Sequence, residues 1–255
     1  MSRDFMADAL TVRVFDDVQS LARAAASDAA AAIRGAVDDR GDANVMLATG
    51  NSQLVFLAAL IEHTDVDWSR VTAFHMDEYV DLPSSHPASF QRYMREKVAS
   101  MITVKEFHYL AGDTGDAQAE ADRYSALLRA HPLDLCVCGI GENGHLAFND
   151  PPVADFDDPL DVKVVALEEA SRRQQVAEGH FASIADVPTH AITVTIPALL
   201  RARRVLAIVP EQRKAAPVQA ALEGPISTAC PASYLRTQPH ATLYIDDESA
   251  SLLAE

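Results

Sequence analysis

Residues 133–151 have the sequence LDLCVCGIGENGHLAFNDP, an apolar run that ends in a glycine-rich turn. The run is apolar apart from Asp134, which is typical of a strand buried on both faces in a parallel sheet. Glycines in the turn allow backbone N–H groups to point toward a ligand. His145 follows at the carboxyl end of the strand, where parallel sheets form their sites. The stretch therefore predicts a polar active-site loop.

Apolar runs alternate with helical patterns along the rest of the chain, with a first strand expected from Leu10 onward. We expect further strands at residues 44–48, 71–76, 133–140, 162–167, 191–196, 204–209 and 241–245. We expect helices at residues 17–37, 52–63, 89–100, 116–130 and 211–223. This alternation predicts one α/β domain over residues 1–255, a three-layer α/β/α sandwich with a largely parallel, Rossmann-like sheet.

The charge of the chain limits its partners. The formal net charge is −16 at pH 7, which argues against nucleic acid because phosphate-backbone affinity depends on Lys and Arg. An anionic small molecule needs a locally positive pocket on such a protein. Basic residues close to the motif loops are therefore informative.

The cellular location is expected to be the cytoplasm. No apolar run approaches the roughly 20 residues of a membrane helix, so we expect no membrane association. The start Met1-Ser2-Arg3-Asp4 has no signal-peptide pattern. Three cysteines cannot form a disulfide framework, which indicates a reducing compartment.

Two further segments carry candidate ligand groups. The turn at residues 49–52 lies between a predicted strand and helix, so its N–H groups and hydroxyls can meet an anion, although Ser52 could instead be a helix N-cap. Lys214 begins a predicted helix, where its charge opposes the helix dipole unless an anion lies beside it. The alternative for Lys214 is a solvated surface lysine.

No metal or dinucleotide site is expected. Cys136 and Cys138 have no matching Cys or His pair at metal-ligand spacing, so we interpret them as small buried residues. Residues 139–144 match G-x-G-x-x-G, but a proline-containing loop follows in place of the helix that a dinucleotide site needs.

Three motifs, LATG at residues 47–50, MDEY at 76–79 and GIGENGHLAFNDP at 139–151, resemble the glucosamine-6-phosphate deaminase/isomerase family. This family is related to 6-phosphogluconolactonase, and the resemblance spans nearly the whole chain. It implies a sugar-phosphate isomerase fold and an enzyme without cofactors. The substrate would be a 2-amino-2-deoxyhexose 6-phosphate, glucosamine 6-phosphate or galactosamine 6-phosphate, which becomes a ketohexose 6-phosphate and ammonia.

The resemblance leaves alternatives open. We expect the terms hydrolase, isomerase and deaminase to describe the enzyme, within amino-sugar and carbohydrate metabolism. Two other hypotheses are a 6-phosphogluconolactonase and a catalytically silent sugar-phosphate-binding protein. The family contains monomers and hexamers, so a homo-oligomer is also open.

The resemblance assigns catalytic roles. Asp77 would carry a proton between C2 and C1, with Glu78 as a structural hydrogen-bond partner. His145 would open the sugar ring, since imidazole exchanges protons near neutrality, and its alternative is a structural histidine. Asn143 and Asp150 stand where the best-known deaminases have Asp and Glu, and both are expected to act with His145 unless Asn143 only holds the loop.

The resemblance also assigns phosphate contacts. They are Thr49, Gly50, Asn51, Ser52 and Lys214. The arginine that many deaminases use falls near Glu178 or Gly179, where this chain has none. Arg172, or its neighbour Arg173, lies one to two helical turns earlier and is expected to replace it.

Overall fold

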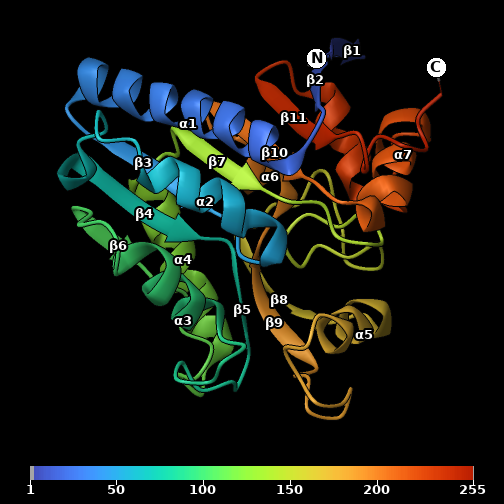
Figure 1. Ribbon diagram of the computed structural model, residues 1–255. Helices are drawn as coiled ribbons and strands as arrows, with labels where there is room; N and C mark the ends of the chain where they lie inside the picture. Colours follow the sequence, from blue (N-terminus) through green and yellow to red (C-terminus); the bar gives the residue numbers. More distant parts are fainter. Residues whose placement is uncertain (1–2, 255) are drawn as a thin grey trace.

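The computed structural model describes residues 3–254, which form an eight-stranded sheet and a separate three-stranded sheet (Figure 1). The strand order of the large sheet is β1-β2-β11-β10-β7-β3-β4-β6. These strands are β1 (Arg3–Ala7), β2 (Leu10–Phe15), β3 (Ala43–Leu47), β4 (Val71–His75), β6 (Glu106–His108), β7 (Leu135–Cys138), β10 (Arg204–Val209) and β11 (Ala241–Asp246). All neighbours pair in parallel except β1 and β2, which confirms the expected α/β class.

Helices cover both faces of the large sheet, and one further helix lies beside the three-stranded sheet. They are α1 (Val18–Arg40), α2 (Leu54–Ile61), α3 (Phe90–Met94), α4 (Ala117–Ala130), α5 (Glu169–Ala177), α6 (Ile196–Leu200) and α7 (Ala215–Glu223). Short 3-10 turns are η1 (Asn51–Gln53), η2 (Trp68–Arg70), η4 (Gln212–Lys214) and η5 (Pro231–Thr237), and the π-helical turn η3 (Arg95–Ala99) extends α3. Within residues 3–254, each helix is too short or too polar to cross a bilayer.

The central strand β7 shows why its sequence is apolar throughout. Leu135 and Val137 pack in the core beneath α1 and α2, whereas Cys136 and Cys138 pack in the core shared with α4, α6 and α7. Successive side chains of a strand point to opposite faces, so a strand covered on both sides needs apolar residues at every position. The two cysteines are buried and free, as predicted.

The second sheet corrects part of the predicted topology. β5 (Asp77–Tyr79), β9 (His190–Val194) and β8 (Val162–Ala166) pair antiparallel, in the order β5-β9-β8. The expectation that residues 162–167 and 191–196 belong to the parallel sheet was wrong. Both strands nevertheless place residues in two cores. Val162 of β8 and Ile192 of β9 belong to the large core, whereas Val165 and Ala191 belong to a smaller one around Tyr79. Two-sided burial gives the same apolar pattern in either sheet.

The order of the strands creates a ligand-binding position at the carboxyl ends of the neighbouring strands β3 and β7. From β3 the chain continues outward through β4 to β6, whereas from β7 it continues to β10 and β11 on the other side. The carboxyl ends of β3 and β7 therefore flank a topological switch point, the usual ligand site of an open α/β sheet. In Figure 1 the β8–β9 pair and α5 lie on the opposite side of the molecule from α1.

Candidate active site

A pocket lies at the carboxyl ends of β3, β4, β7 and β10, with α5 along its rim. It collects residues from six segments of the chain, within residues 48–52, 76–77, 87–93, 139–148, 174–180 and 213–214. Its polar lining includes Thr49, Gly50, Asn51, Ser52, Asp77, Ser89, Tyr93, His145, Gln174, Gln175, Glu178, His180, Arg213 and Lys214. The pocket thus brings together residues of all three sequence motifs, and it contains most of the site residues that were expected from the sequence.

The turn after β3 presents backbone groups to the pocket. Gly50 has φ 104°, a left-handed conformation that glycine adopts without strain, and its carbonyl accepts a hydrogen bond of 3.0 Å from Tyr93 Oη. η1 and α2 begin without a side-chain capping hydrogen bond. The N-cap alternative for Ser52 is therefore wrong, and its hydroxyl lies in the pocket lining.

Asp77 and Glu78 have opposite surroundings. Asp77 lines the pocket, is 6% exposed, and its Oδ1 has no hydrogen-bond partner among residues 3–254. Burial, followed by the neighbouring Glu78 charge, raises the pKa of Asp77 to about 8. Glu78 instead accepts hydrogen bonds from the Tyr79, Phe90 and Gln91 N–H groups and from Ser89 Oγ.

Glu78 therefore fixes the start of α3. Ser89 also caps this helix through its hydroxyl, which accepts from the Arg92 N–H group at 3.3 Å. The expectation that Glu78 is a structural hydrogen-bond partner is confirmed by these contacts.

His145 and Asp150 form a close pair. His145 Nδ1 lies 2.8 Å from Asp150 Oδ1, and Ser171 Oγ donates to the same carboxylate oxygen at 2.6 Å. Burial alone would raise the pKa of Asp150, but hydrogen bonds from His145, Ser171 and Asn143 lower it to about 2. The imidazole lies directly over Gly141, where a Cβ atom would be 2.2 Å from His145 Nε2. Nε2 is the ring nitrogen left for a ligand.

Asn143 contacts the partners of His145 and not its ring. Its Nδ2 donates to Asp150 Oδ1 and to Glu168 Oε2, both at 2.9 Å, and its Oδ1 accepts from the His145 N–H group at 3.1 Å. An amide is suited to this place because it offers two donors to two carboxylates. Asn143 thus orients Asp150 and holds the turn.

Lys214 is buried at the pocket wall. It is 4% exposed, and its Nζ donates to the Ile140 carbonyl at 2.8 Å. The alternative of a solvated surface lysine is therefore wrong. Burial, and next the charge of Arg213, lower the pKa of the ammonium.

Arg172 does not reach the pocket. Its Nη2 donates to the carbonyls of Ile184 at 2.6 Å and Val187 at 2.9 Å, so the guanidinium holds the loop before β9. Arg173 is paired with Glu169 on the exposed side of α5. The expectation that either arginine reaches the phosphate end of the pocket is corrected, because neither lines the pocket and their guanidinium groups contact Ile184, Val187 and Glu169 instead.

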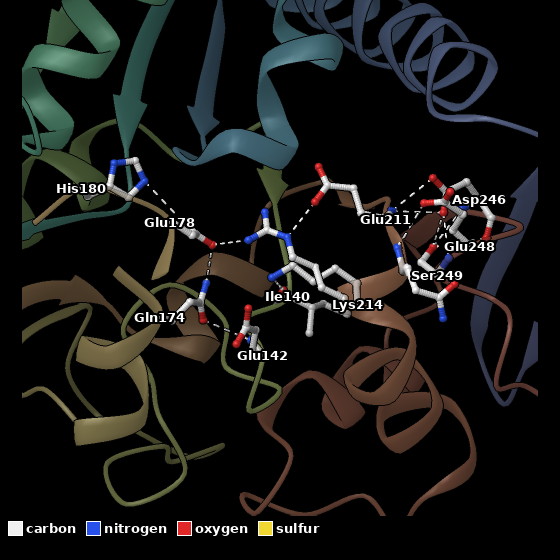
Figure 2. A network of polar contacts seen from close by, with 12 residues as sticks. Ile140, Glu142, Gln174, Glu178, His180, Glu211, Lys214, Asp246, Glu248 and Ser249 are labelled. Atoms are coloured by element: carbon white, nitrogen blue, oxygen red, sulfur yellow. Dashed lines mark hydrogen bonds and ion pairs between the residues drawn. The ribbon is translucent and has the colours of Figure 1, made fainter. Parts of the chain in front are cut away.

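Three residues of the pocket lining, Arg213, Glu178 and Gln174, were not expected from the sequence. Glu178 Oε1 accepts from Gln174 Nε2 at 2.9 Å and from Arg213 Nη1 at 2.5 Å, and Figure 2 shows Glu178 between Gln174 and His180. The signal for Arg213 was its position beside Lys214. Glu178 and Gln174 gave no local signal, since their places depend on how α5 packs.

Comparison with known proteins identifies the family. The family model for glucosamine-6-phosphate isomerases/6-phosphogluconolactonase matches residues 16–244. The chain belongs to this family. A curated relative from Listeria monocytogenes serotype 4a (strain HCC23), named glucosamine-6-phosphate deaminase, is 38% identical over 217 residues, which are 84% of this chain and 89% of the relative. A relative of the same name from Exiguobacterium sibiricum is 36% identical over 82% of this chain and 81% of its own.

Solved structures agree with the family. One, described as a monomeric glucosamine-6-phosphate deaminase, has a TM-score of 0.85 and 31% identity, covering 95% of this chain and 99% of its own. A 6-phosphogluconolactonase from Shewanella baltica OS155 has a TM-score of 0.76 over 95% of this chain and 99% of its own, but its 22% identity supports the fold alone. The expected term hydrolase was wrong, because the relatives are named deaminases and the family description names isomerases.

Proposed function

We propose that this protein converts glucosamine 6-phosphate and water to a ketohexose 6-phosphate and ammonia. The observation that carries this proposal is that Asp77 and His145 line one pocket. Asp77 is a buried carboxyl whose Oδ1 has no partner among the described residues, and His145 is paired with Asp150. The names of the relatives support the same reaction. Galactosamine 6-phosphate is the second substrate that the family resemblance implies.

His145 is proposed to open the sugar ring. With Nδ1 facing Asp150, Nε2 can take the proton of the anomeric hydroxyl and return it to the ring oxygen. The low pKa of Asp150 keeps that carboxylate ionised, so it stabilises the imidazolium that forms in transit. Asn143 and Ser171 hold Asp150 in this orientation.

Asp77 is proposed to move the proton between carbons. An ionised carboxylate takes the proton from C2 to give an enol-type intermediate, and the proton returns at C1 to leave an imine at C2. Water then hydrolyses this imine to the ketone and ammonia. Asp77 Oδ1 suits this role because no protein donor competes for it among residues 3–254. A carboxyl pKa of about 8 also makes Asp77 a stronger base than an exposed aspartate.

Phosphate binding is proposed for the other end of the pocket. Lys214 offers a buried ammonium, and Thr49, Gly50, Asn51 and Ser52 offer N–H and hydroxyl donors at the start of η1. The net charge of −16 makes these local donors necessary for an anion. We also propose one domain over residues 1–255 and a cytoplasmic location without nucleic-acid partners, and leave the oligomeric state to measurement.

Product analysis tests the reaction. Glucosamine, galactosamine and N-acetylglucosamine 6-phosphates are incubated separately with the protein, and ammonia and ketose phosphate are both measured. We expect the two products in equal amounts from glucosamine 6-phosphate. Binding of these sugars without either product would instead indicate a catalytically silent sugar-phosphate-binding protein. Asp77→Asn is the matched control for product formed by a contaminating enzyme.

A further inference from the structure

Arg213 and Lys214 are the only arginine and lysine among the described residues that line the pocket. We infer that Arg213 is the second phosphate-binding cation of this pocket, in the place expected for Arg172. This inference rests on the proposed function, because it concerns the same pocket. Two observations support the inference. The carboxylates of Glu211 and Glu178 hold the Arg213 guanidinium, and other N–H groups of the guanidinium remain available to a ligand.

Glu211 holds one edge of the Arg213 guanidinium. Its Oε2 accepts from Arg213 Nε at 2.7 Å. The backbone of Glu211 is itself fixed, since its N–H group contacts Asp246 Oδ1 at 3.2 Å and Oδ2 at 3.1 Å (Figure 2). Glu211 also has φ 84°, a left-handed conformation that is strained for a residue other than glycine. The contacts with Asp246 hold this turn after β10, and Arg213 follows it in the pocket lining.

Glu178 holds the next nitrogen from across the pocket. Arg213 Nη1 donates to Glu178 Oε1, while His180 Nε2 lies 3.3 Å from Oε2. Burial would raise the pKa of Glu178, but hydrogen bonds from His180 and Gln174 and the charge of Arg213 lower it to about 2. The Glu178 carboxylate is therefore a permanent anchor for Arg213 at neutral pH.

The remaining donors of Arg213 are available to a ligand. A guanidinium has five N–H groups, and the hydrogen bonds of Arg213 within residues 3–254 use only Nε and Nη1. Nη2 is free, and its planar fork suits a phosphate better than a single ammonium does. Together with Lys214, Arg213 supplies two positive charges for a phosphate dianion.

Two carboxylates that orient an arginine also oppose the anion that it would bind. Glu178 and Glu211 cancel the formal charge of Arg213 and Lys214 in the empty pocket. The affinity for phosphate therefore depends on direct hydrogen bonds more than on a long-range positive field. Loss of Arg213 would remove one cationic partner of Glu178, and the Glu178 carboxylate would then repel the anion.

A binding measurement without turnover tests this inference. The probe is 2-deoxyglucose 6-phosphate, which has no C2 amino group to lose, and binding is followed by calorimetry with 2-deoxyglucose as the phosphate-free control. Arg213→Gln should weaken binding of the phosphorylated probe about 10- to 100-fold, as expected for lost charge-assisted hydrogen bonds. Arg173→Gln is the matched control on the exposed side of α5 and should bind as the parent does.

A second pair of variants guards against misfolding. Glu178→Gln keeps the shape of the Arg213 contact, and adding Arg213→Gln to it leaves two neutral amides that can bond to each other. Within this pair, the loss of Arg213 should again weaken the phosphorylated probe about 10-fold or more. Thermal unfolding of each variant shows whether it is folded. Arg213→Gln is compared with the parent if it is folded, and otherwise the double variant is compared with Glu178→Gln.

The possible outcomes separate this inference from the proposed reaction. Arg213 is not a phosphate ligand if a folded Arg213→Gln variant binds the phosphorylated probe within twofold of the protein that differs from it only at position 213. The same conclusion follows if the parent does not prefer the phosphorylated sugar. If binding depends on Arg213 but no ammonia is released from any amino-sugar phosphate, the proposed reaction fails and the inference about Arg213 stands.

Discussion

Asp77 is distinguished from its neighbour Glu78 by having no hydrogen-bond donor at Oδ1 within residues 3–254. Replacing the carboxyl by an amide in Asp77→Asn keeps the size of the side chain but removes the proton acceptor. We expect turnover to fall about 100-fold or more, with sugar-phosphate binding largely unchanged. Steady-state rates and calorimetry on the same preparation check this. A variant that retains a tenth of the parent rate would exclude Asp77 as the base.

The raised pKa of Asp77 also predicts a pH-dependent stability. The carboxyl has a pKa near 8 when folded and 3.8 as its ordinary value, so the unfolded chain releases the proton first. This contribution to stability is fully present below about pH 4 and is lost as pH rises to about 8. Relative to Asp77→Asn, the parent's free energy of unfolding should fall by about 1 kcal/mol per pH unit in that window. Equal pH profiles in denaturant unfolding would contradict the raised pKa.

Asn143 stabilises a place where two carboxylates meet. Asn143→Asp removes both donors to Asp150 and Glu168 and adds a third negative charge beside them. We expect a loss of about 1–3 kcal/mol in the free energy of unfolding at pH 7, since a hydrogen-bonded network is left unpaired. Chemical denaturation measures it. Unchanged stability would mean that the loop rearranges at no cost.

At the scale of elements, the turn after β7 is shaped by the space that glycine leaves. Gly141→Ala would place a Cβ atom 2.2 Å from His145 Nε2, so the ring must move. We expect activity to fall at least about 10-fold, because a displacement of about 1 Å in a catalytic group can cost up to 100-fold. Gly35→Ala is the matched control, since a Cβ there meets nothing within 4 Å. Parent-like rates in Gly141→Ala would show that the ring is free to shift.

At the scale of the whole molecule, the pocket draws residues from both sheets. Asp77 belongs to the three-stranded sheet, whereas Thr49 and Lys214 follow strands of the large one. A bound sugar phosphate therefore requires the folded arrangement of both. A sugar phosphate present at 100 times its dissociation constant should raise the free energy of unfolding by about 2.7 kcal/mol. The protein should unfold in a single thermal transition. Two separate thermal transitions, with only one moved by the ligand, would contradict this.

The local sequence was sufficient for most elements of the large sheet. Strands covered on both faces must be apolar at successive positions, as in β7, and helices between them must have the matching composition. The turn after β7 was also visible locally, because strand ends and glycines mark where a parallel sheet forms a site, whereas the role of Asp77 came from the family resemblance. These features depend on residues near one another in the chain.

Tertiary structure alone decided the partner of each strand and the direction of each charged side chain. β8 and β9 are apolar for the same reason as β7, so their antiparallel pairing with each other and with β5 could not be deduced from their residues. Arg172 and Arg213 are both plausible cations in the sequence, yet one holds the loop before β9 and the other lines the pocket. The physical reason is that hydrophobic periodicity records burial, whereas pairing and side-chain direction depend on contacts between distant segments.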